Sequence, residues 1–189
     1  MSFVRGHPVI RILMTLNLLA LFAGFIIPLI PVYAADVFDV GGSGFGVMMA
    51  AFGVGGILAT FVLVFGGDRV GKGLLMVVSG GLFGAGMILF AFSRDYYLSL
   101  FLLGLMGAFG MAYVITINVL VQTHTPDVMR GRVMSLFGIT MQLFALGFLF
   151  GGVIAQATSN EVALIVGGVG TAIPPVGAYL FSGELRRVA

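Results

Sequence analysis

Residues 97–121 read YLSLFLLGLMGAFGMAYVITINVLV, an apolar stretch without a charged side chain. A helix needs about 20 such residues to cross the hydrocarbon core of a bilayer. Five further apolar stretches flank this one, and short polar segments separate them. We therefore predict one transmembrane domain over residues 1–189, with six spans at about residues 9–34, 44–65, 74–92, 97–121, 133–156 and 162–181.

The pattern inside these stretches predicts their secondary structure. Transmembrane β-strands alternate apolar and polar residues, and these stretches do not alternate. Every backbone N–H and C=O group in lipid needs an internal partner, so non-alternating spans have to be helical. The predicted fold class is all-α, a polytopic membrane protein.

The composition excludes several classes of protein. Hydrophobic residues make up 60% of the chain and charged residues 8%, with a mean hydropathy of +1.17. Soluble domains are about a quarter charged, so a soluble enzyme, a nucleic-acid-binding protein and a disordered linker are excluded. The chain has no cysteine, which removes disulfides and thiolate metal sites. We expect no enzyme activity, cofactor or metal.

The basic residues predict the orientation, because cytoplasmic loops carry an excess of lysine and arginine. One side of the predicted membrane has Arg94 alone. The other side has Arg5, Arg11, Arg69, Lys72, Arg130, Arg132, Arg186 and Arg187. Both termini are therefore expected in the cytoplasm, in a bacterial-type inner or plasma membrane.

A weak internal repeat links the second and fifth spans. VMMAAFG surrounds Phe52 and VMSLFG surrounds Phe137. Each is followed by a second phenylalanine at the same spacing, since 65 − 52 and 150 − 137 are both 13. Three-plus-three inverted repeats are typical of secondary transporters.

Glycines and prolines interrupt the spans. Gly80/Gly84 and Gly147/Gly151 form G-x-x-x-G pairs, which let helix backbones approach closely. Such contacts serve static packing, or they let helices slide between two states. Prolines inside spans predict kinks in the first span, at Pro28 and Pro31, and in the sixth, at Pro174–Pro175.

Two polar loops lie on the predicted cytoplasmic side. Residues 66–73 read GGDRVGKG, in which the acid could cap a helix N-terminus and the bases could anchor the loop to lipid phosphates. Residues 122–135 read QTHTPDVMRGRVMS. There Thr125, Pro126 and Asp127 suit the N-cap, N1 and N2 positions of a short helix that ends at Gly131.

These loops resemble those of the major facilitator superfamily. Asp68, Arg69, Gly71 and Lys72 match its G-x-x-x-D-R-x-G-R-R motif, whereas Val64 replaces the first glycine and Gly73 the last basic residue. Residues 122–135 resemble the loop between helices ten and eleven of macrolide-efflux and enterobactin exporters. By this resemblance the cytoplasmic latch consists of Asp68, Arg69, Gly71, Lys72, Asp127, Arg130, Gly131 and Arg132.

The resemblance covers essentially the whole chain, but only as helices seven to twelve of a twelve-helix fold. It implies either a fragment or a half-size protein, whose partner is the missing N-terminal half or a second six-helix chain. The implied function is secondary-active efflux of small amphipathic molecules, drug-like or siderophore-like, by alternating access in the lipid bilayer. Protons are the candidate coupling ion, but no acidic side chain falls within the six ranges, so their relay is expected elsewhere.

Four amides at membrane depth are the candidates for a substrate cavity. An unpaired amide in lipid is costly, so each has to face protein or water. Asn118 and Gln122 lie four residues apart and share a helix face. Hydrogen bonds between helices and the lining of a cavity both explain such residues. The candidate cavity residues are Asn17, Asn118, Gln122 and Gln142.

Two other functions fit parts of the sequence. Gly41-Gly42-Ser43-Gly44 matches the G-x-S-G text of rhomboid-type intramembrane proteases, but the sixth span has no histidine to act as the base. A non-transporting six-helix assembly protein, or a truncated relic, would have the same composition. The pair of loop motifs favours the transporter, because a scaffold has no need of them.

Overall fold

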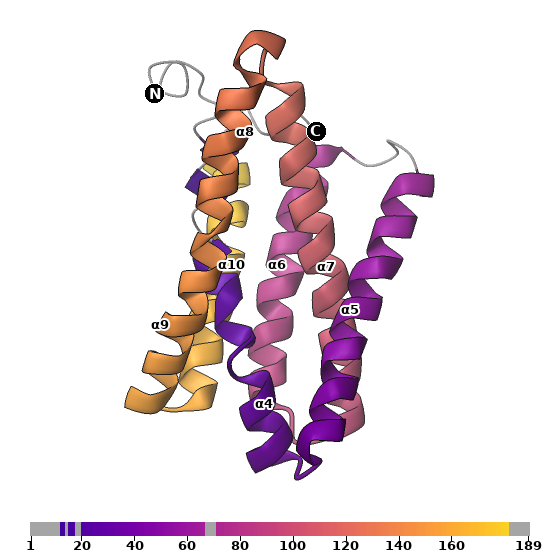
Figure 1. Cartoon of the computed structure of the whole chain (residues 1–189), viewed down its shortest axis with the longest axis vertical. Coiled ribbons are helices and arrows are strands. Elements are labelled where there is room, and N and C mark those ends of the chain that lie inside the picture. Colours follow the sequence, from indigo (N-terminus) through magenta and orange to yellow (C-terminus); the bar gives the residue numbers. More distant parts are fainter. Residues whose placement is uncertain (1–11, 14, 18–19, 67–70, 182–189) are drawn as a thin grey trace.

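The computed structural model describes residues 12–13, 15–17, 20–66 and 71–181. Within this part of the chain it is a bundle of long helices without a strand (Figure 1). Six segments in it are long and apolar enough to cross a membrane. They are Thr15–Val37, Gly41–Gly66, Lys72–Phe92, Tyr96–Thr123, Asp127–Ala157 and Asn160–Ala178. The predicted all-α polytopic fold is confirmed.

The first span is irregular, as its prolines predict. It contains α3 (Ala20–Ala23), the 3₁₀ turn η1 (Gly24–Ile26), α4 (Ile30–Val32) and the π-helical turn η2 (Tyr33–Val37). Pro28 has no N–H to donate to the Gly24 carbonyl. The Ile27 N–H bonds that carbonyl instead, at 3.4 Å, which tightens the turn.

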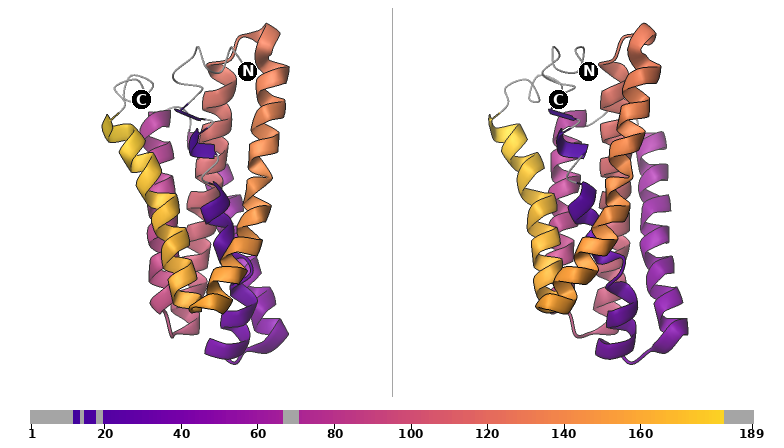
Figure 2. Two further views of the ribbon diagram at one scale, coloured as in Figure 1. Left: turned by 90° about the vertical axis from the view of Figure 1, so that its left-hand side faces the viewer. Right: turned by 60° about the vertical axis from the view of Figure 1, so that its left-hand side comes forward.

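The other spans are regular helices. They are α5 (Gly41–Gly66), α6 (Lys72–Phe92), α7 (Tyr96–Thr123), α8 (Asp127–Met141) followed by α9 (Leu143–Ala157), and α10 (Asn160–Phe181). Figure 2 shows α8 and α9 as one long rod that ends beside the start of α10. α10 continues through Pro174 and Pro175.

The structure of the fifth span differs from the prediction in two details. Its helix begins at Asp127 instead of near residue 133, and Gly131 lies inside α8 without ending it. A single glycine costs a helix only about 1 kcal/mol. Pro126 is the non-helical residue before the helix, and the Thr125 hydroxyl donates to the carbonyl four residues earlier at 2.6 Å instead of capping α8. The interruption falls at Gln142.

Glycines set the crossings between the spans. α5 packs chiefly against α7, α6 against α10, and the first span against α9. At the first crossing, a Cβ on Gly107 would collide with the Phe52 carbonyl oxygen. At the second, a Cβ on Gly168 would lie 2.6 Å from the Gly84 carbonyl oxygen. At the third, a Cβ on Gly147 would lie 3.0 Å from the Gly24 Cα.

This pairing has the form that a three-plus-three repeat requires. In such a repeat, spans one, two and three correspond to spans four, five and six. The pair of spans two and four (α5–α7) then corresponds to the pair of spans five and one (α9 with the first span), and the pair of spans three and six (α6–α10) corresponds to itself. α5 and α8 also run in opposite directions (Figure 1). The two repeated phenylalanines correspond as well: the Phe52 carbonyl faces Gly107, and the Phe137 carbonyl accepts a hydrogen bond from Asn17 at 3.3 Å.

Two clusters of buried apolar side chains fill the bundle. One joins the ends of the spans around Phe25, Phe90 and Leu103. The other lies toward the opposite end, around Met76 and Ile117. Members of both clusters, Phe83 from the first and Leu16 from the second, also line a cavity between the helices.

Replacing a crossing glycine should destabilise the bundle, whereas a matched glycine in open space should tolerate the change. We expect Gly107→Ala to lower the free energy of unfolding by at least about 2 kcal/mol, because backbone atoms cannot move aside for the new methyl group. Gly46→Ala, where a Cβ would have nothing within 4 Å, should leave stability unchanged or raise it. Thermal unfolding in detergent measures both. Equal midpoints for the two variants would contradict the crossing.

Candidate functional site

A partly open cavity of about 480 Å³ lies between the helices, and all six spans contribute to its wall. Small-molecule sites commonly measure roughly 300–1,000 Å³. Phe52, Phe83 and Phe144 provide aromatic surface, and Met111 and Met141 provide flexible apolar surface. Among the described residues that line the cavity, none is charged.

Three hydroxyl groups are the polar side chains of this wall. Thr60 on α5 donates its hydroxyl to the Gly56 carbonyl at 2.9 Å. Thr171 on α10 donates to the Gly167 carbonyl at 2.7 Å. Tyr113 on α7 donates across the bundle to the Leu16 carbonyl at 3.3 Å. The first two bonds are local to their helices, whereas the third ties α7 to the first span.

Glycines give the cavity its width. Gly53 and Gly56 on α5 and Gly80 on α6 belong to the wall, together with Gly107 and Gly110 on α7. A Cβ at Gly53 would have nothing within 4 Å, so this position faces open space. A side chain at Gly53 would therefore extend into space that is now open.

The structure places Asn17 in a contact between helices. Its side chain is fully buried, and its Nδ2 donates to the Phe137 carbonyl and to the Thr140 hydroxyl. Its Oδ1 has no partner among the described residues. Asn17 therefore holds the first span to α8, and its neighbour Leu16 belongs to the cavity wall instead.

The other three amides lie outside the wall of this cavity. Gln122 donates to the Asn118 side chain at 2.8 Å, so the expected pairing on one face of α7 is present. Gln122 is exposed near the end of α7, and Asn118 is half-buried. Gln142 is exposed at the junction between α8 and α9.

The predicted latch residues that the structure describes lie at one end of the bundle, where α6 and α8 begin (Figure 1). The Arg130 guanidinium lies 2.7 Å from the Asp127 carboxylate, one helical turn away, and both side chains are exposed. Gly131 and Arg132 are exposed beside them. Gly71 and Lys72 stand at the start of α6. Asp68 and Arg69 lie outside the described residues.

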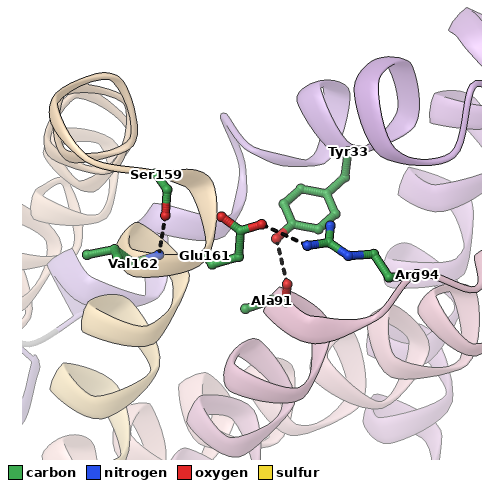
Figure 3. A network of polar contacts seen from close by, with 6 residues as sticks. All are labelled: Tyr33, Ala91, Arg94, Ser159, Glu161 and Val162. Atoms are coloured by element: carbon green, nitrogen blue, oxygen red, sulfur yellow. Dashed lines mark hydrogen bonds and ion pairs between the residues drawn. The ribbon is translucent and has the colours of Figure 1, made fainter.

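A polar cluster joins three helix ends at the opposite end of the bundle (Figure 3). Arg94, after α6, lies 2.9 Å from the carboxylate of Glu161 in the first turn of α10. The buried Tyr33 hydroxyl donates to the Ala91 carbonyl at 2.9 Å, next to this ion pair. The Ser159 hydroxyl accepts the Val162 N–H at 3.3 Å and caps α10.

Catalytic or metal chemistry finds no support in the described part of the chain. No group of His, Cys, Asp and Glu in it is placed to hold a metal ion. Ser43 lies in the first turn of α5, whereas His124 ends α7 at the opposite end of the bundle. These two side chains therefore cannot act together as a nucleophile and base.

Sequence reasoning missed the residues that line the observed cavity. Of these residues, Tyr113 has the clearest signal in the sequence, because it lies in mid-span, whereas Tyr33, Tyr96 and Tyr97 lie near span ends. A tyrosine at membrane depth needs a partner for its hydroxyl. Thr171 gives no comparable signal, since threonine bonds its own helix wherever it occurs in a membrane span.

The comparisons with known proteins give one match. The model of a family described as transmembrane secretion effector, within the major facilitator group, matches residues 2–185. Searches of curated proteins and of solved structures return no match.

Removing the buried amide should weaken the bundle more than removing the half-buried one. We expect Asn17→Ala to lower the free energy of unfolding by about 1–2 kcal/mol, because two hydrogen bonds between the first span and α8 are lost. Asn118→Ala breaks only the contact with Gln122 and should cost less than about 0.5 kcal/mol. Chemical unfolding in mixed micelles compares the two. A larger loss for Asn118→Ala would contradict the assignment of Asn17.

Proposed function

The chain belongs to the transmembrane secretion effector family of the major facilitator superfamily, and from this membership we propose that it is one six-helix half of an exporter of small amphipathic molecules. Membership makes it a multi-pass membrane transport protein. The proposal adds the direction of transport, the class of cargo and alternating access as the mechanism.

The cavity carries the proposal. It is large enough for a small molecule, and every span contributes to it, so a movement of any helix changes its shape. Its wall offers aromatic and thioether surface with a few hydroxyl groups, which suits a cargo that is apolar over most of its surface. A static assembly protein gains no stability from such a space, because unfilled volume costs packing energy.

The exposed faces of two spans support pairing with a second six-helix unit. The buried residues of α5 are Gly44, Met48 and Gly55, and the fifth span has four, fewer than any other span of the described chain. Leu58, Phe61, Val62 and Phe65 on α5 are more than half exposed. In the proposal, α5 and the α8–α9 rod face this second unit, which is the N-terminal half of a facilitator or another six-helix chain. The coupling acid for protons belongs to it.

The cytoplasmic loops are proposed to latch the inner gate. Asp127 and Arg130 already pair on one turn of α8 and remain exposed, so their charges can exchange partners with the second unit. Arg132 adds positive charge to the same turn. Asp68, Arg69, Gly71 and Lys72 form the second loop of the latch, and both termini are placed on this cytoplasmic side.

Neutralising the latch acid should stop transport without affecting insertion. We expect Asp68→Asn to slow energised efflux of N-phenyl-1-naphthylamine from cells by about tenfold or more, since a hydrogen bond to a charged group contributes about 1.5–3 kcal/mol. Asp36→Asn, which removes the same charge at the exposed opposite end of the bundle, is the control. Membrane abundance of each variant is measured alongside.

Two results would count against the proposal. Unchanged efflux in Asp68→Asn would remove the latch. Equal dye accumulation in energised cells with and without the protein would remove the export function and leave the assembly protein as the better reading.

A further inference from the structure

We propose that the cavity selects molecules with an aromatic body, at least one N–H or O–H donor and no negative charge. This inference deepens the proposed function, on which it rests, by assigning the cavity a hydrogen-bonding sense. It rests on the hydrogen bonds that the polar side chains of the described wall make.

The described wall has no free hydrogen-bond donor among its side chains. Its polar side chains are Thr60, Tyr113 and Thr171, and each spends its single hydroxyl hydrogen on a backbone carbonyl. Most of the wall belongs to the continuous helices α5, α6, α7 and α10, whose backbone N–H groups are bonded within each helix. A ligand that needs a donor from a side chain therefore finds none among the described residues of the wall.

The wall does have free acceptors. A hydroxyl oxygen that has donated its hydrogen still holds two lone pairs, so the hydroxyl oxygens of the wall residues Thr60, Tyr113 and Thr171 can still accept hydrogen bonds. The Thr171 carbonyl adds a fourth, because Pro175, four residues later, has no N–H to give it. Both Thr171 and Pro175 belong to the wall. A ligand without a donor would leave the Thr171 carbonyl unpaired, which is costly, and would make none of the bonds that the three hydroxyl oxygens can accept.

The same wall is unfavourable for anions. A carboxylate or sulfonate needs donors or positive charge when it leaves water. The described wall has no charge and no free side-chain donor, since none of its residues is charged and each hydroxyl hydrogen is engaged. Acidic siderophore-like cargo is therefore disfavoured among the candidates, and neutral aromatic cargo is favoured.

The apolar part of the wall specifies the body of the ligand. Phe52, Phe83 and Phe144 come from three different spans, so a flat ring system meets ring faces or edges from several sides. Met111 and Met141 are flexible side chains that adapt to a ring edge. A fused aromatic system with a single donor satisfies both parts of the wall.

Three probes with one ring system separate these requirements. N-phenyl-1-naphthylamine is neutral and has one N–H, its N-methyl derivative has no donor, and 8-anilino-1-naphthalenesulfonate adds a negative charge. Equilibrium binding of each tritiated probe is measured on the full chain in lipid nanodiscs, with empty nanodiscs subtracted. We expect the N-methyl derivative to bind about fivefold more weakly than the parent, the equivalent of one neutral hydrogen bond. The sulfonate should show no saturable binding.

Variants locate the binding in the cavity. Gly53→Leu should abolish saturable binding of N-phenyl-1-naphthylamine by filling the open space in front of α5. Gly46→Leu is the matched control, because it lies seven residues earlier on the same helix, also has open space, and is not in the wall. Thr60→Val should weaken the parent probe and leave the N-methyl derivative unchanged.

Each outcome decides the inference. Equal binding of all three probes, no saturable binding of the parent, or full binding by Gly53→Leu would overturn it. Equal binding of the probes together with energised efflux would leave the proposed function standing. Donor-selective binding without efflux would support the inference and remove the exporter.

Discussion

Close contact between glycines and the backbone of a facing helix is the constraint on which the structure depends. Lipid tails are as apolar as leucine side chains, so burial alone does not hold helices together in a membrane. Here three pairs of spans, α5–α7, α6–α10 and the first span with α9, meet where Gly107, Gly168 or Gly147 lets another backbone approach. The three crossings obey the exchange of halves in a three-plus-three repeat.

The cavity follows from where those crossings lie. Members of both apolar clusters line it, and the glycines in its wall leave width that side chains do not occupy. Threonine hydroxyls return to their own helices, and Tyr113 ties α7 to the first span. The result is a cavity whose wall has hydrogen-bond acceptors and aromatic rings, and no charged side chain among the described residues. Charge is concentrated at the two ends, at Asp127–Arg130 and at Arg94–Glu161.

How much of this could be read from the sequence depends on the range of the interactions. Six spans and the break at Pro28 follow from hydropathy and from a missing N–H, which are local properties. The position of the break in the fifth span cannot be predicted in this way. Glycine is the weaker helix former, yet the helix continues through Gly131 and breaks at Gln142, so packing against neighbouring helices decides the position. Asn17 illustrates the same limit: a buried amide was foreseeable, but whether it faces a cavity or α8 depends on the helix rotation set by Gly24 and Gly147. The sequence could not predict that the cavity offers hydrogen-bond acceptors, because this depends on which carbonyl each hydroxyl group bonds in the folded structure.

Access to the cavity from the two sides of the membrane tests the account most directly. The chain has no cysteine, so Gly53→Cys provides a single thiol in the cavity wall. Its rate of modification by a membrane-impermeant maleimide is measured in right-side-out and inside-out vesicles. The account predicts modification from both sides, with the two rates changing in opposite directions when a cargo or an ion gradient is applied. Modification from one side only, under every condition, would contradict alternating access.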